Sequence, residues 1–143
     1  MKTVVLRHEF VETVPQHLDE GVLYVSMLYA TAVHRCCCGC GTEVVTPLSP
    51  TDWQMTFNGE TVSLNPSIGN WSFKCRSHYW IRQGRITWGT QLSGREIAAL
   101  RAGQRLEKDR YYKGAAAHHG ATTAEPTPPA SRRRWWQFWR LDG

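Results

Sequence analysis

The sequence predicts an α+β protein: a small, mainly antiparallel β domain, then one C-terminal helix and a flexible tail. Short β-rich runs separated by turn residues occupy the first ninety residues, and a helical period begins near residue 93. Four of the five cysteines fall within five residues, and such clusters usually hold a metal. A body of roughly a hundred residues has a modest core, so we expect a zinc-binding domain stabilised by its metal.

The β domain is expected to span residues 1–92. Two hairpins are expected where turn dipeptides, Asn58-Gly59 and Gln83-Gly84, separate short alternating runs. The runs that we expect to form strands are Val4–Leu6, Val22–Tyr29, Thr31–His34, Val44-Val45, Trp53–Phe57, Thr61–Leu64, Tyr79–Arg82 and Arg85–Trp88.

The C-terminal helix is expected over residues 93–113. Ser93 and Glu96 form a capping box, and Gly114 is expected to end the helix. Residues 114–130 are small and proline-rich, which predicts a disordered linker. Residues 131–143 form a basic and aromatic tail.

The charge distribution argues against a nucleic-acid-binding protein. Residues 1–100 carry eight basic and eight acidic side chains, so the net charge of +5 belongs to the helix and the tail. Duplex affinity needs many phosphate contacts, which a neutral body does not supply. No signal peptide and no transmembrane stretch is visible, so we expect a reducing cytoplasm.

The metal site is expected between Cys36–Cys40 and the Cys75-Arg-Ser-His78 segment. Zinc takes about four soft or borderline ligands in a tetrahedron, and Gly39 and Gly41 would let the backbone curl so that sulfurs converge. Spacing alone leaves six candidate ligands for four places. They are Cys36, Cys37, Cys38, Cys40, Cys75 and His78.

Several motifs together resemble the BubE-like family of bacterial ubiquitination-like operons. They are His34-x-Cys-x-Cys-Gly-Cys-Gly41, Val45-Thr-Pro-Leu48, Trp53, Ser63-Leu-Asn-Pro-Ser-Ile-Gly-Asn70 and Cys75-Arg-Ser-His-Tyr-Trp-Ile81. The resemblance covers about residues 1–90. The position of Cys37 looks variable in the family, so the resemblance favours Cys36, Cys38, Cys40 and Cys75 as zinc ligands, with His78 as an alternative.

The resemblance implies a partner in ubiquitin-like processing, acting with a ubiquitin-like protein and E1-like and E2-like enzymes. It favours a serine-type peptidase that matures or removes the ubiquitin-like protein, with zinc in a structural role. Four cysteine ligands would leave Ser67, Ser77, His34 and His78 free for chemistry. Adjacent residues on a strand face opposite ways, so Ser77 and His78 are not expected to pair with each other. We therefore expect Ser77 to pair with His34, and His78 is a further candidate for a catalytic residue.

Three questions stay open from the sequence. The first is which carboxylate orients the histidine, for which Glu9, Glu12 and Asp52 are the candidates. The second is the function, since the alternative to a peptidase is a non-catalytic zinc-ribbon-like adaptor for the ubiquitin-like protein or its enzymes. The tail segment Arg132–Leu141 interleaves arginines with tryptophans, which fits an anionic membrane surface, a groove on a protein partner, or contact with its own domain.

Overall fold

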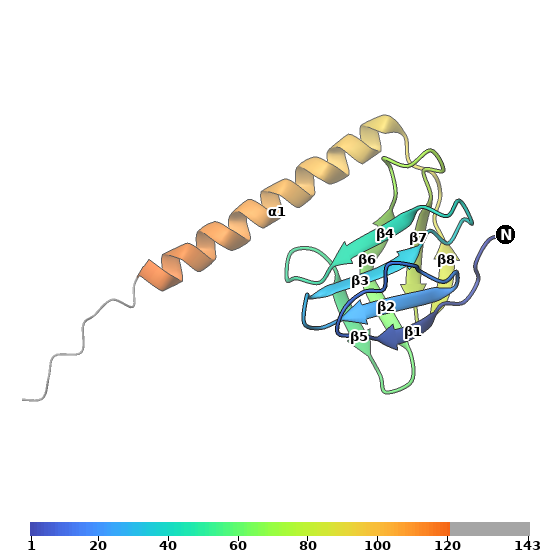
Figure 1. Cartoon of the computed structure of the whole chain (residues 1–143). Helices are drawn as coiled ribbons and strands as arrows, with labels where there is room; N and C mark the ends of the chain where they lie inside the picture. Colours follow the sequence, from blue (N-terminus) through green and yellow to red (C-terminus); the bar gives the residue numbers. More distant parts are fainter. Residues whose placement is uncertain (121–143) are drawn as a thin grey trace, which may run out of the picture. The chain divides into compact units, whose positions relative to one another are not determined.

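The computed structural model describes residues 1–120, and it contains two four-stranded sheets and one helix (Figure 1). The first unit, Met1–Asp109, holds both sheets and the first part of the helix, and the second begins at Arg110. The elements are β1 (Arg7–Phe10), β2 (Val22–Ser26), β3 (Thr31–Arg35), β4 (Glu43–Pro47), β5 (Gln54–Phe57), β6 (Val62–Gly69), β7 (His78–Arg82), β8 (Arg85–Trp88) and α1 (Gly94–Gly120).

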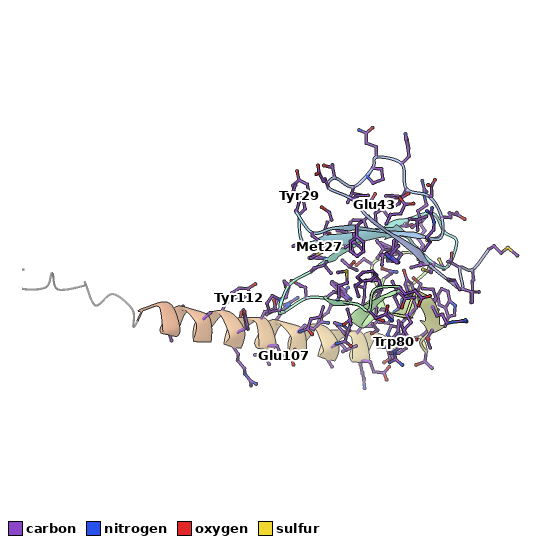
Figure 2. All side chains as sticks on the ribbon, turned by 90° about the horizontal axis from the view of Figure 1, so that it is seen from below. Met27, Tyr29, Glu43, Trp80, Glu107 and Tyr112 are labelled. Carbon is purple, nitrogen blue, oxygen red and sulfur yellow. The ribbon has the colours of Figure 1, made fainter. Side chains whose placement is uncertain are left out.

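The two sheets form a sandwich, which confirms the predicted α+β class with its mainly antiparallel strands. Strands β1-β2-β3-β4 make one sheet and β5-β6-β7-β8 the other, with only the β1–β2 pair parallel. Figure 2 shows the sheets edge-on, with Trp80 on the second sheet. Their facing side chains share one core that includes Leu23 and Val25 from the first sheet and Ile68 and Ile81 from the second.

Strand β2 is buried along its whole length, which explains its continuous apolar sequence. Leu23 and Val25 point into the core between the sheets. Val22 and Tyr24 point the other way, into a smaller cluster with Leu18 and Val33. The segment between β1 and β2 therefore covers the outer face of the first sheet at this point.

The first strand begins later than predicted, at Arg7. The apolar run Val4–Leu6 instead contacts the β8 hairpin, where Val5 bridges Arg85 and Leu6 N–H donates to Gly84 O at 2.7 Å. This contact partners the edge of β8 and links the N-terminal segment to the second sheet.

The two predicted hairpins are confirmed, but β6 runs five residues beyond the predicted Leu64. The register between β6 and β7 shifts between Leu64 and Ile68, so three residues of β6 lie opposite Trp80 alone. The sequence does not indicate a strand at Asn65 and Pro66, because a proline has no N–H to donate to the hydrogen bonds between strands. A bulge accommodates them.

Helix α1 begins as predicted and ends later. Ser93 N–H donates to Glu96 Oε2 at 2.7 Å, and Glu96 N–H donates to Ser93 Oγ at 3.4 Å, which completes the capping box. The prediction that Gly114 ends the helix is wrong, because the helix continues to Gly120 through three alanines, the strongest helix formers. The rest of the predicted linker and the tail lie outside the described residues.

Candidate active site and metal centre

The cysteine loop after β3 curls back on itself through two glycines. Gly39 and Gly41 have φ of 85° and 74°, a left-handed region that other residues rarely adopt. Gly39 N–H donates to Cys36 O at 3.0 Å, and Cys36 N–H donates to Thr42 O at 2.8 Å. The predicted role of the two glycines is confirmed, and the turn places three sulfurs on its inner side.

The sulfurs of Cys36, Cys38, Cys40 and Cys75 lie within 4.8 Å of one another. The Sγ–Sγ distances are 3.4 Å for Cys36–Cys38, 3.7 Å for Cys40–Cys75 and 3.9 Å for Cys36–Cys75. A tetrahedral zinc with bonds of about 2.3 Å has sulfurs about 3.8 Å apart, so the donor set fits such an ion. Cys75 precedes β7, so a metal here would join the two sheets.

The other two ligand candidates lie outside this group. Cys37 is fully buried in the core between the sheets, and burial raises the pKa of its thiol to about 12. His78 bonds other partners, which are described below. Four sulfurs complete a tetrahedron and leave no open position, which is the arrangement of structural zinc sites.

Three of the cluster thiols, Cys36, Cys38 and Cys40, differ in how easily they ionise. Hydrogen bonds from Thr42 lower the pKa of the exposed Cys40 to about 6. Desolvation raises the pKa of Cys36 and of Cys38. Metals bind the thiolate form of cysteine. With its lowered pKa, Cys40 loses its proton at a lower pH than Cys36 and Cys38 do.

Ser77 lies behind the cluster and not beside a histidine. Its Oγ is 3.1 Å from Cys36 Sγ and 3.5 Å from Cys75 Sγ, and it accepts a hydrogen bond from Asn70 Nδ2 at 2.9 Å. The hydrogen bond between Ser77 and Cys36 lowers the Cys36 pKa against the larger effect of burial. Such bonds orient metal ligands from outside the coordination shell.

His34 is also not placed beside Ser77, so the expected pair does not form. Its ring is fully buried, and Nε2 lies 2.8 Å from the Tyr79 hydroxyl. Burial lowers the pKa of His34 to about 4, so the ring is neutral. The prediction failed because Ser77, just before β7, bonds Asn70 and Cys36, while Tyr79 on β7 bonds His34.

A serine and a histidine do meet on the opposite face of the same strand. His78 Nε2 is 3.0 Å from Ser67 Oγ, and His78 Nδ1 is 3.0 Å from the main-chain oxygen of Thr90. A carbonyl can only accept, so Nδ1 carries the proton and Nε2 presents a lone pair to the Ser67 hydroxyl. The hydroxyl therefore has a base within hydrogen-bond reach, and the base has an orienting acceptor.

The bulge in β6 explains why Ser67 lies there. Gly69 is directly opposite His78 in the β6–β7 ladder, and Ser67 lies two residues earlier on the same face. The three bulge residues Asn65, Pro66 and Ser67 shift that face relative to β7. Ser67 therefore contacts the imidazole of His78, although the direct cross-strand neighbour of His78 is Gly69.

None of the three predicted orienting carboxylates contacts a histidine within residues 1–117. Asp52 bonds Lys108 and Ser49, and Glu9 bonds Arg7. Glu12 accepts from Ser26 through its main-chain oxygen. The orienting acceptor is a backbone carbonyl, for which no residue type in the sequence gives a signal.

Two indoles flank His78. The Trp71 and Trp80 rings have centroids 5.0 Å and 4.9 Å from the imidazole centroid. Ser67 and His78 are partly buried, so the pair is sheltered and still open to a ligand. The arrangement of hydroxyl, imidazole and acceptor is that of the serine hydrolase class.

Comparison with known families places the chain more narrowly. Residues 10–89 match the family described as bacterial ubiquitination-like system serine protease (BubE). The chain belongs to this family, as its motifs indicated. No curated protein and no solved structure matches it. The matched residues include the cysteine loop after β3 and the strands β6 and β7, and they end at Gly89.

Sequence reasoning named Ser67 as a free hydroxyl but did not pair it with His78. One signal was present: His78 and Ser67 lie on strands that flank a candidate cysteine ligand, and Pro66 next to the serine indicated an irregular strand.

No membrane-spanning candidate is found, since no helix within residues 1–120 is long and apolar enough to cross a bilayer.

Proposed function

We propose that this protein is a serine-type peptidase of a bacterial ubiquitination-like pathway, with Ser67 as nucleophile and His78 as general base. The observation that carries the proposal is the position of His78 between the Ser67 hydroxyl and the Thr90 carbonyl, at 3.0 Å from each. The family description supports the reaction class.

The proposed reaction begins with attack by Ser67 Oγ on the carbonyl carbon of the scissile bond, while His78 Nε2 accepts the hydroxyl proton. The imidazolium that forms keeps its Nδ1 proton on the Thr90 carbonyl. His78 then gives its Nε2 proton to the leaving amine, and an acyl-enzyme remains on Ser67. A water that loses its proton to Nε2 releases the acid and restores the hydroxyl.

We assign the four-cysteine centre to zinc in a structural role. Thiolate ligands in a tetrahedral set favour zinc among common divalent ions. Cys75 lies three residues before His78, and the Ser77 hydroxyl is 3.1 Å from the Cys36 sulfur. Bound metal would therefore fix the start of β7, the strand that carries the proposed base.

The proposed substrate is the ubiquitin-like protein of the same pathway, either as a precursor or as a conjugate. E1-like and E2-like enzymes would be its pathway partners. The alternative is an adaptor that binds the same proteins without chemistry. It predicts a stable complex and no turnover, and it gives no reason for the Ser67–His78 contact.

The test is cleavage of the cognate ubiquitin-like precursor by purified variants. Ser67→Ala and His78→Ala should each reduce turnover by about 1,000-fold or more. A fluorophosphonate probe should label the unaltered protein on Ser67 and leave Ser67→Ala unlabelled. Ser72→Ala, an exposed serine in the loop between β6 and β7, is the matched control and should cleave normally.

Two results would contradict the proposal. Full cleavage by Ser67→Ala would remove the assigned nucleophile. A complex with the ubiquitin-like protein that forms at equal affinity in all variants, with no product from the unaltered protein, would support the adaptor instead.

A further inference from the structure

We propose that Gly69, Trp71 and Gly89 are positioning residues that hold the imidazole of His78 in the one orientation that serves Ser67. The proposal rests on the proposed function of the Ser67–His78 pair. Neither glycine has the left-handed φ that would require glycine for backbone reasons. The structure instead places a ring against each of them, so the absent side chain is what matters.

The first ring is His78 itself, which lies against the main chain of Gly89. A Cβ at residue 89 would be 2.5 Å from His78 Nδ1 and 2.8 Å from Cε1, and also 2.9 Å from Trp80 Cζ3. Real Cβ atoms essentially never approach so closely, so an alanine would displace the imidazole. Residue 90, whose carbonyl holds Nδ1, follows directly, so one turn of backbone both supports and orients the ring.

The second ring is the indole of Trp71, which covers Gly69. A Cβ at residue 69 would be 2.4 Å from both Cε2 and Nε1 of Trp71. Gly69 is the direct cross-strand neighbour of His78, so the indole that covers it also lies beside the imidazole. Any larger residue at 69 would move Trp71 away from this position or push it against His78.

Together these contacts limit rotation of the imidazole about its Cβ–Cγ bond. A half turn would exchange Nδ1 and Cδ2 and break both hydrogen bonds at once. In a slot between Trp71, Trp80 and Gly89, that turn has little room. The slot therefore selects the geometry in which Nε2 accepts from Ser67, and preorganisation of this kind lowers the barrier to proton transfer.

The first experiment uses Gly89→Ala and Gly69→Ala in the full chain, with Gly103→Ala as control because a Cβ there meets nothing within 4 Å. For each variant, the ¹⁵N shifts of the His78 ring report its tautomer, and fluorophosphonate labelling reports Ser67 reactivity. We expect both altered glycines to lose the single Nδ1–H tautomer. We also expect labelling to slow by about 100-fold and kcat to fall with KM little changed. Gly103→Ala should behave normally.

A double-variant cycle separates positioning from general damage to the fold. Gly69→Ala in a Trp71→Ala background has no indole to displace, so it should change the labelling rate less than twofold relative to Trp71→Ala alone. If Gly89→Ala does not fold, this cycle still decides the role of Gly69 and Trp71.

Unchanged tautomer and labelling in both glycine variants would overturn the proposal. So would equal effects of Gly69→Ala with and without Trp71. Failure of the proposed function has a different signature. In that case Ser67→Ala keeps its cleavage activity, while the ring shifts of His78 still respond to Gly89→Ala.

Discussion

At the scale of single residues, the serines at positions 67 and 77 have different chemistry. Ser77 is buried, accepts a hydrogen bond from Asn70 and is hydrogen-bonded to the Cys36 sulfur, and no histidine contacts it among the described residues. Ser67 is partly exposed and bonds an imidazole. Their partners, and not their residue type, separate a ligand-orienting hydroxyl from a candidate nucleophile.

The hydroxyl of Ser77 should affect metal affinity more than catalysis. Ser77→Ala removes the bond to Cys36 and leaves Asn70 without its closest acceptor, so metal affinity should fall by about 10- to 100-fold. Competition with a chromophoric chelator measures this, with Ser72→Ala as the control. At saturating metal, cleavage should be nearly normal; loss of cleavage in fully loaded Ser77→Ala would return this serine to the reaction.

The two kinds of cysteine should respond differently to the same replacement. Cys75→Ser should abolish stoichiometric metal binding, since it removes one of four clustered sulfurs. Cys37→Ser should keep the metal but place a hydroxyl in the core, which costs about 1–3 kcal/mol in the free energy of unfolding. Metal analysis and urea denaturation of the metal-loaded proteins measure these outcomes. Metal loss in Cys37→Ser would show that the ligand set differs.

At the scale of elements, hairpins and helix start were predictable, and the site was not. Asn58-Gly59 and the Ser93–Glu96 box are local signals, because turn and cap residues act on their own neighbours in the chain. The site depends on a register shift between β6 and β7, which no local signal gives. The place of the cysteine cluster was predictable from residue type and glycine spacing, whereas the choice of Cys36, Cys38, Cys40 and Cys75 among six candidates came from the family resemblance.

An ion pair of Lys108 with Asp52 connects α1 to the loop before β5. Lys108 and Ser49 lower the Asp52 pKa, so the carboxylate stays charged at pH values below its usual titration range, and the pair is lost only as pH falls through that lowered pKa. Partly exposed pairs contribute little to stability. We therefore expect a local effect.

Asp52→Asn should speed amide hydrogen exchange around the last turns of α1 before Asp109, while the melting temperature stays nearly constant. Lys108→Ala should give the same pattern, and the double variant should add nothing. Lys113→Ala, on the same helix in the second unit, is the control. Additive effects of the two single variants would show that the pair does not act as one contact.

At the scale of the whole molecule, the four-cysteine cluster brings the two sheets together, so a metal bound there would join them. Three ligands follow β3 of the first sheet, and the fourth precedes β7 of the second. Metal binding to a preformed set of this kind contributes directly to the free energy of folding. Such a cross-link would support a core that is modest for two four-stranded sheets.

Removal of the metal should lower the melting temperature by at least about 10 °C. Hydrogen exchange should rise most around residues 36–42 and 70–78, on both sides of the centre. Scanning calorimetry with and without chelator measures the first effect, and readdition of zinc should restore it. An unchanged melting temperature in metal-free protein would mean that the sandwich does not depend on this cross-link.

The Thr90 carbonyl has a consequence for genetics. In most catalytic triads the third member is a side chain, so a codon change can remove it. Here the acceptor is peptide backbone, which every amino acid at position 90 supplies. A saturation screen for loss of function should therefore register residues 67 and 78 and tolerate substitutions at 90, provided they keep the main-chain path. A change of side chain therefore cannot remove this acceptor from the proposed catalytic site.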